Sequence, residues 1–335
     1  MRRGTLSVIA AVVAVPLALV SLSGQGPQPS KGPRANAAPP GVAKASKTPW
    51  GEPDLQGLWT NKTITPLERP RDLGTKEFYT AEEASERERQ AVIRATDEAR
   101  GTDAKSDVAG AYNDFWWDRG TKDVKTHRTS LIISPANGRI PWRPEVMQHN
   151  AERAKIRDAM LDSPNPISTW LDVDTGERCI TDGIPWTPGA YNNNYLIVQS
   201  PGNIAITHEM YRELRVFTVG DRPRANIPQW FGNSSARWEG NTLVVDTDNF
   251  ADKSAIWWPQ AWRQARPSYR ITERFTRGDA DTLVYEFTVT DPTLFTSPWT
   301  AQLPMAKAEG QIFEYACHEA NYAMPSMLGS NKSSK

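Results

Sequence analysis

The sequence predicts a mainly β protein, an antiparallel barrel or curled sheet of about eight to ten strands with two helical insertions near the N-terminus. Strand-like runs separated by Gly, Pro and Asn follow one another from Arg128 onward. Two segments, 236–245 and 273–285, share an Arg-aromatic pair, a Gly-containing turn and Thr-Leu-Val, which is typical of repeated hairpins. The sequence has no Gly-rich phosphate loop and no alternation of strands with helices, so a nucleotide-binding fold is not expected.

Two helices are expected before the β-rich part of the chain. Thr80 followed by Glu83 forms a capping box, and strong helix formers continue over 81–99. Because this segment is dense in Glu and Arg, we expect it on the surface. Pro144 suits the first position of a second helix over 144–161.

Hairpins account for most of the predicted strands. We expect 195–198 and 204–208 to pair across Ser-Pro-Gly-Asn, with 213–219 as the next strand. Two further pairs are predicted, 129–134 with 138–142 across Pro-Ala-Asn-Gly, and 299–305 with 311–318.

The ends of the chain carry the features of an exported protein. A basic start precedes an uncharged apolar run from Thr5 to Leu22, which is the pattern of a signal peptide over 1–23. A second suitable cleavage site follows Ala37, and an uncleaved anchor is the alternative, since the run is just long enough to span a bilayer. We expect a disordered leader over 24–47, a single barrel domain with helical insertions over 48–328, and a flexible tail over 329–335.

The charge balance argues against two kinds of partner. Lys and Arg number 39, as do Asp and Glu, so the formal net charge is zero. Removing Arg2 and Arg3 with the signal peptide leaves 37 of the 39 basic residues, and the mature chain is slightly acidic. No nucleic-acid partner is therefore expected, and no membrane partner after signal cleavage. The predicted location is secreted or periplasmic.

The only two cysteines, Cys179 and Cys317, lie far apart in the sequence. An oxidising compartment permits a disulfide between them, which would stabilise the fold by about 4–5 kcal/mol if it acts by restricting the unfolded chain. Two buried free thiols, or one reactive thiol, are the alternatives.

Several segments resemble known families. Gly57-Leu-Trp59 resembles the first-strand signature of lipocalins and their calycin relatives. From Trp50 to about Leu328 the chain is similar to a family of secreted bacterial proteins, and this similarity implies export and a lipocalin-like barrel but no particular chemistry. The segments that carry it are PWGEPDLQG at 49–57, TPLERP at 65–70, YNNNY at 191–195 and YACHE at 315–319.

His208 is the leading candidate for acid–base chemistry, because the ordinary pKa of a histidine is near neutrality. Strand alternation places His208 on one face with Ile204 and Ile206, and Glu209 on the other. If the isoleucines line the barrel, His208 points inward, whereas a bulge would exchange it with Glu209. The alternative is a core histidine whose nitrogens are satisfied by Tyr or by backbone oxygen.

His318 and Glu319 form a second candidate pair. Alternation along the predicted strand 311–318 would place Cys317 inside and His318 outside. Because alternation often fails at a strand end, His318 and Glu319 both remain candidates. His127 and His149 are expected to be exposed.

Polar and aromatic residues near these histidines are candidates for substrate binding. The amide-rich loop before 195–198 could form a rim, although Asn also favours turns for local reasons. The Trp pair at 257–258 lies in a predicted loop and could form a lid. The candidates are Tyr191, Asn193, Tyr195, Tyr211, Arg212, Trp257, Trp258, Asn321 and Tyr322.

No metal or cofactor is predicted. A catalytic zinc commonly takes three protein ligands. The two residues of an adjacent His-Glu pair point to opposite faces of a strand, so they do not bind the same ion together. The sequence lacks HExxH and Gly-x-Ser-x-Gly motifs.

The resulting hypothesis is a secreted, cofactor-independent enzyme in which His208 moves a proton on a small organic substrate inside the barrel. A lyase, isomerase, cyclase or hydrolase would fit. The alternative is a lipocalin-like carrier of an apolar or aromatic molecule, and a carbohydrate-binding module is a third class that the 13 tryptophans allow.

Overall fold

The computed structural model describes the strands and the segments that cover them. It describes residues 46–95, 118–161, 169–170, 173–220, 226–252, 261–263, 266–319 and 321–329. The predicted signal peptide, most of the predicted leader and the tail from residue 330 lie outside these ranges. Lys47 bridges to Pro53, and Asp54 N donates to the carbonyl of Ser46, so the last residues of the predicted leader are paired with the domain.

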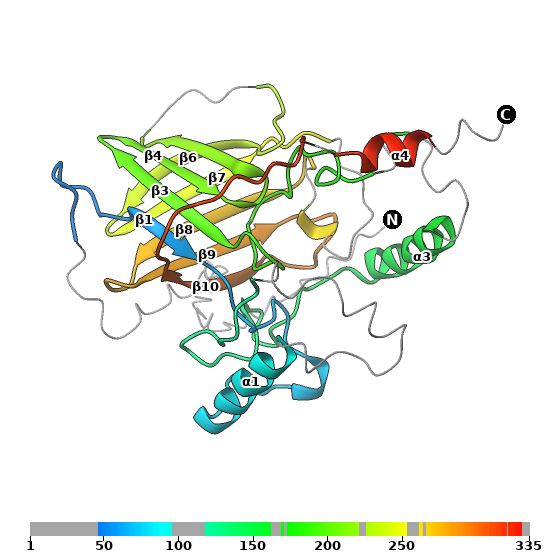
Figure 1. Ribbon diagram of the computed structural model, residues 1–335, viewed down its shortest axis with the longest axis horizontal. Coiled ribbons are helices and arrows are strands. Elements are labelled where there is room, and N and C mark those ends of the chain that lie inside the picture. Colours follow the sequence, from blue (N-terminus) through cyan, green and yellow to red (C-terminus); the bar gives the residue numbers. More distant parts are fainter. Residues whose placement is uncertain are drawn as a thin grey trace, which may run out of the picture. The chain divides into compact units, whose positions relative to one another are not determined.

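Within the described residues, ten strands form one antiparallel sheet that curls into a nearly closed barrel, which confirms the predicted fold class (Figure 1). Nine strands follow the path β5-β4-β3-β1-β10-β9-β8-β7-β6, and β2 pairs with β10. The strands are β1 Gly57–Thr60, β2 Ile132–Ser134, β3 Asn194–Ser200, β4 Asn203–His208, β5 Glu213–Thr218, β6 Asn233–Glu239, β7 Thr242–Asp248, β8 Arg270–Arg277, β9 Thr282–Thr290 and β10 Trp299–Lys307.

The seam of the barrel lies between β5 and β6. Strand directions alternate along a path of nine strands, so the first and the last strand run the same way. They accordingly meet through a parallel bridge between Val219 and Ala236, where Gly220 N also donates to the carbonyl of Ala236 at 2.9 Å. Backbone pairing at the seam is therefore much sparser than along the antiparallel ladders.

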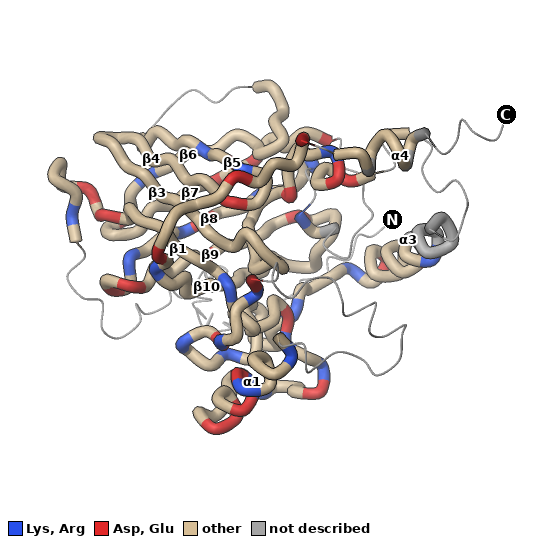
Figure 2. Tube along the Cα trace, in the orientation of Figure 1, with Lys and Arg blue, Asp and Glu red and all other residues tan. Residues whose placement is uncertain are grey.

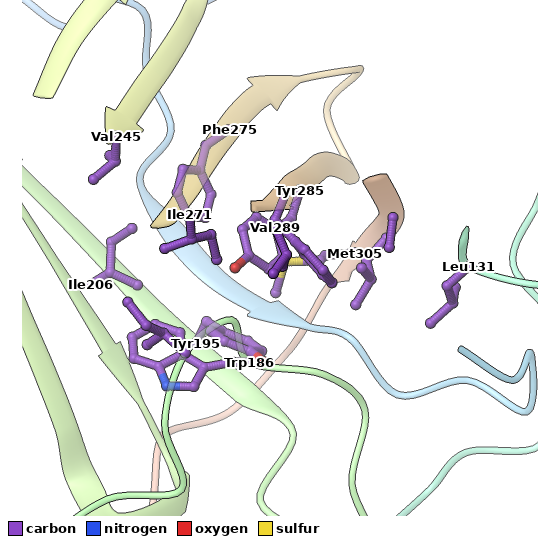
Figure 3. Packing of buried hydrophobic residues seen from close by; sticks show 14 of the residues in the cluster. Leu131, Trp186, Tyr195, Ile206, Val245, Ile271, Phe275, Tyr285, Val289 and Met305 are labelled. Carbon is purple, nitrogen blue, oxygen red and sulfur yellow. The ribbon is translucent and has the colours of Figure 1, made fainter. Parts of the chain in front are cut away.

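Three predicted hairpins are confirmed, and each owes its register to a short turn. β3 and β4 pair from Ser200–Asn203 to Tyr195–His208, and β6–β7 and β8–β9 pair in the same manner. Along β4 the side chains of Ile204 and Ile206 are buried, and Figure 3 shows Ile206 among the core residues of the barrel. On β5, by contrast, Leu214 and Val216 face outward and are more than half exposed.

Two predicted strand pairs are wrong. The segment 138–142 does not pair with 129–134; instead β2 pairs with β10, and Leu131 N donates to the carbonyl of Pro66. The segment 311–318 forms no strand. Residues 131–134 have no free edge for 138–142, because β10 lies on one edge and the backbone of Pro66 and Leu67 on the other. β10 has no free edge for 311–318, because β9 lies on one edge and β1 and β2 on the other.

The two predicted helices are present. α1, Ala81–Arg94, begins with the complete Thr80–Glu83 capping box and ends before the predicted residue 99. α3 spans Pro144–Leu161, as predicted. Another described helix, α4 Ala323–Gly329, was not expected. No helix of the described ranges is long and apolar enough to cross a bilayer.

The predicted disulfide between Cys179 and Cys317 is confirmed, with the Cα atoms 5.6 Å apart and 138 residues between them in sequence. It attaches the C-terminal segment to the loop that precedes β3. Such a bond is consistent with an extracellular or periplasmic protein.

An ion pair inside the barrel crosses the seam. Arg215 on β5 donates through Nη1 and Nη2 to the two carboxylate oxygens of Glu273 on β8, at 2.9 and 2.6 Å. The hydroxyl of Tyr285 also donates to Glu273, at 2.7 Å, and Arg215 contacts Thr247 at 3.2 Å. Both charged side chains are almost completely buried. Elsewhere acidic and basic residues are interspersed along the described chain (Figure 2).

Removing one partner of this ion pair should destabilise the fold strongly. Arg215→Met leaves the Glu273 carboxylate buried without its cation, and we expect the free energy of unfolding in urea to fall by about 3–5 kcal/mol. The double variant Arg215→Met/Glu273→Met should recover most of this loss. Arg212→Met, which breaks an exposed pair with Glu314, is the control and should cost less than about 1 kcal/mol. Equal losses in the single and double variants would contradict the argument.

Candidate functional site

His208 is the last residue of β4, and its side chain lies inside the barrel. It follows Ile204 and Ile206 on the inward face, and only 5% of the residue is exposed. The centroid of its ring lies 4.6 Å from that of Tyr195 and 5.0 Å from that of Trp186, and both pairs are stacked. Figure 3 shows Trp186 and Tyr195 side by side in the core. Alternation along the strand therefore holds to its last residue, and no bulge exchanges His208 with Glu209.

Burial keeps His208 neutral. Desolvation, with the positive charge of Arg263 as a smaller cause, lowers the pKa of His208 from 6.5 to about 3. Its Nδ1 atom is buried and has no hydrogen-bond partner among the described residues. The Tyr or backbone oxygen expected for an ordinary core histidine does not reach this nitrogen.

Glu213 is the acidic partner that the sequence did not reveal. It is the cross-strand neighbour of His208 in the β4–β5 ladder, and it is 97% buried. Its Oε1 accepts hydrogen bonds from Thr181 Oγ1 at 2.5 Å and Asp182 N at 2.7 Å, and its Oε2 accepts from Trp186 Nε1. Burial, the largest cause, raises the pKa of Glu213 from 4.5 to about 7. Alternation with Phe217 on β5 was the available signal that Glu213 points inward.

The loop before β3 holds Thr181 and Trp186 against Glu213. It begins with a reciprocal pair, in which Asp174 N donates to the Glu177 carboxylate and Glu177 N donates to the Asp174 carboxylate, both at 2.9 Å. Gly183 has a φ of +80°, and a Cβ atom there would lie 3.0 Å from the carbonyl oxygen of Arg263. The disulfide at Cys179 attaches this loop to the C-terminal segment.

Glu209, the other residue of the predicted His-Glu pair, forms hydrogen bonds with two distant parts of the chain. Although it is buried, its carboxylate accepts Asn194 Nδ2 at 2.8 Å and Phe313 N at 3.0 Å. Glu209 therefore ties the C-terminal segment to the start of β3, and it is Glu213 that stands opposite His208.

Tyr211 and Arg212 form the turn between β4 and β5, and both have left-handed backbone angles, with φ of 55° and 52°. The Tyr211 ring packs on Tyr315 at 4.8 Å, and Arg212 pairs with Glu314 at 2.5 Å. Burial raises the pKa of Tyr211 above its ordinary value. Both side chains therefore contact the C-terminal segment.

The predicted rim is mostly a folded turn. Asn193 is 99% buried, and its amide donates to the carbonyl of Asp118 at 2.8 Å and accepts from Gly189 N at 2.8 Å. Tyr191 is half-buried in the same loop. Tyr195 points into the barrel, where its hydroxyl meets Asn61 Nδ2 at 2.5 Å.

The second predicted cluster does not join His208 through any contact between described residues. His318 and Glu319 are exposed on the C-terminal segment, one and two residues beyond Cys317. Asn321 contacts the carbonyl of Glu177 at 3.4 Å, and Tyr322 is 75% exposed. Trp257 and Trp258 lie outside the described residues. Within the described ranges, no group of three or more His, Cys, Asp or Glu side chains is arranged to hold a metal ion.

No model of a known protein family matches the sequence, and a comparison with curated proteins finds no match. The similarity to lipocalins and to a secreted bacterial family therefore stays a prediction, whereas the barrel itself is shown.

Stability should depend on pH through Glu213. The folded protein keeps the Glu213 proton up to about pH 7, whereas the unfolded chain loses it near pH 4.5. The stability from this proton is complete below pH 4.5 and is lost as the pH rises through 7, a change of about 3 kcal/mol. Measured by urea unfolding from pH 4.5 to 7.5, the wild type should lose about this much relative to Glu213→Gln. Glu314→Gln, which removes an exposed carboxylate, is the control and should leave the wild-type slope unchanged.

His208 should produce the opposite pH dependence at lower pH. The unfolded chain binds a proton at His208 below about pH 6.5, but the folded protein does not until about pH 3. Stability is therefore lost as the pH falls from 6.5 to 3, by roughly 4–5 kcal/mol relative to His208→Phe, which keeps a ring in the cluster. The exposed His149→Phe is the control. If the free energies of unfolding of the wild type and His208→Phe change in parallel over this range, the folded protein binds a proton at His208 as readily as the unfolded chain does, which would contradict the argument.

Proposed function

We propose that this protein is a secreted or periplasmic enzyme that uses no cofactor and transfers a proton on a small organic molecule, with His208 and Glu213 as the working pair. The observation that carries the proposal is the register of β4 and β5, which places these two residues opposite each other on the inner face. Trp186 contacts both, because its ring stacks on His208 and its Nε1 donates to Glu213.

The chemistry of the pair suits acid–base catalysis near neutral pH. Burial moves the two pKa values in opposite directions, to about 3 for His208 and about 7 for Glu213. Buried groups with strongly shifted pKa values are typical of catalytic sites. Glu213 would give and take the proton, since an acid with a pKa near the working pH does both. The neutral His208 would orient the substrate through its unpaired Nδ1.

The location is supported by two independent features. The confirmed Cys179–Cys317 bond requires oxidising conditions to form, and the N-terminal pattern predicts export. The reaction type stays within the classes expected from the sequence, namely lyase, isomerase, cyclase or hydrolase.

A comparison of turnover by matched variants tests the proposal. The wild-type full chain is screened against a library of small neutral molecules, and each hit is assayed with Glu213→Gln and His208→Phe. Loss of a positioned acid or base should lower kcat by about 10²- to 10⁴-fold for Glu213→Gln, and the limb of the pH–rate profile near pH 7 should disappear. Glu209→Gln and Glu314→Gln are the controls for a buried and an exposed carboxylate.

Equal turnover by wild type and Glu213→Gln, with both folded, would contradict the proposal. The carrier alternative is motivated by the aromatic cluster of Phe287, Trp262 and Trp299 in the core. A ligand that copurifies with the protein, is not converted and is retained by His208→Phe would favour that alternative.

A further inference from the structure

The C-terminal segment, residues 308–322, leads from β10 to α4 (Figure 1). Its described residues form no strand and no helix, and most of them are exposed, including Phe313 at 63%. A segment that buries so little apolar surface has low local stability, so its position depends on a few specific contacts.

One set of contacts reaches the turn between β4 and β5. This turn, residues 209–212, joins the two residues of the candidate pair directly. Phe313 N donates to the Glu209 carboxylate at 3.0 Å, and the ring of Tyr315 packs on that of Tyr211 with the centroids 4.8 Å apart. The C-terminal segment therefore contacts both the start and the middle of the turn.

The other set reaches the loop before β3, through the disulfide between Cys317 and Cys179. Two residues after Cys179, the Thr181 hydroxyl donates to the Glu213 carboxylate at 2.5 Å, and the next residue donates to it through Asp182 N at 2.7 Å. The disulfide thus attaches the C-terminal segment close to the groups that position Glu213.

The turn and the loop also contact each other. A Cβ atom at Gly176 would lie 2.7 Å from the Tyr211 hydroxyl, so only glycine allows the loop to lie this close to the turn. Tyr211 contacts the loop through its hydroxyl and Tyr315 through its ring. A movement of the C-terminal segment would therefore reach both structures together.

Backbone strain is concentrated where the C-terminal segment makes these contacts. Cys179, Tyr211 and Arg212 have left-handed φ angles of 56°, 55° and 52°. Cys179 is bonded to the segment, Tyr211 packs on Tyr315, and Arg212 pairs with Glu314. Left-handed angles are unfavourable for residues other than glycine and persist only where the surrounding structure maintains them. Loss of the segment would remove part of what maintains them.

We propose that the Cys179–Cys317 bond is a redox latch: its reduction releases the C-terminal segment and frees the turn 209–212 and the loop before β3. Control of catalysis by this latch rests on the proposed function, whereas the release itself does not. Both cysteines are partly exposed, and access is what thiol–disulfide exchange requires.

The reductant is a dithiol. One of its thiolates attacks the sulfur of one cysteine, which breaks the Cys179–Cys317 bond, forms a mixed disulfide and releases the other cysteine. Its second thiolate then displaces the first cysteine. The dithiol gives up two electrons and two protons and becomes a disulfide, and Cys179 and Cys317 become two thiols.

The test is amide hydrogen exchange of the full chain, followed by mass spectrometry, with and without dithiothreitol. The backbone hydrogen bonds of Glu209, Arg212 and residues 178–181 protect amides in the turn and the loop of the oxidised protein. We expect reduction to speed exchange over 174–186 and 209–213 by about tenfold or more, and to leave β7–β9 unchanged.

Two variants serve as controls. Cys179→Ser/Cys317→Ser should exchange like the reduced wild type, and dithiothreitol should not change it further. Glu314→Gln breaks only the exposed pair with Arg212 and keeps the disulfide, so its exchange should match that of the oxidised wild type.

Turnover of any substrate found by the screen gives a second measurement. Reduction should lower kcat by about tenfold or more, because small displacements of catalytic groups cost this much. Reoxidation with oxidised glutathione should restore kcat in the wild type and have no effect on the double serine variant.

Two exchange results would overturn the latch. Unchanged exchange after reduction would show that the disulfide does not maintain the turn or the loop. Equally faster exchange in β7–β9 would show that it stabilises the whole barrel instead. The two proposals fail separately: Glu213-dependent turnover that survives reduction overturns the latch alone, and local release in a protein without Glu213-dependent turnover overturns the proposed function alone.

Discussion

The Arg215–Glu273 ion pair is the interaction on which the rest of the barrel depends. Nine strands in an alternating path must close with a parallel contact, and this seam has one backbone bridge in the described part of the chain. Side chains that reach across the seam therefore replace much of the missing ladder. Arg215 does so from β5, and its charge is tolerated inside because Glu273 accepts from both of its terminal nitrogens, while Tyr285 donates to the same carboxylate.

The properties of the candidate site follow from the same closed interior. Glu213, Arg215 and Phe217 alternate on the inner face of β5, so the closure that buries Arg215 also buries Glu213. Desolvation then acts on an acid and a base that stand opposite each other, and it raises the pKa of Glu213 while it lowers that of His208. The loop held by Cys179 adds hydrogen bonds that keep the Glu213 carboxylate in place.

Sequence reasoning succeeded where local periodicity determines the outcome. The capping box at Thr80, the hairpin over β3 and β4, and the inward direction of His208 all depend on spacings of a few residues. It failed for 138–142 and 311–318, because the segments expected to pair with them already have other partners on both edges. It could not show that the backbone N–H of Phe313, more than a hundred residues away, donates to the carboxylate of Glu209.

By itself the sequence determined that this chain is mainly β, that its hairpins pair locally, that its two cysteines can join, and that His208 faces inward. These properties depend on short-range spacing and on the chemistry of single residues. Only the tertiary structure decided that Glu213 stands opposite His208, that the C-terminal segment contacts the turn between them, and that Arg215 finds Glu273 across the seam. The physical reason is that burial and pairing are properties of the closed barrel, which brings together side chains that no local pattern connects.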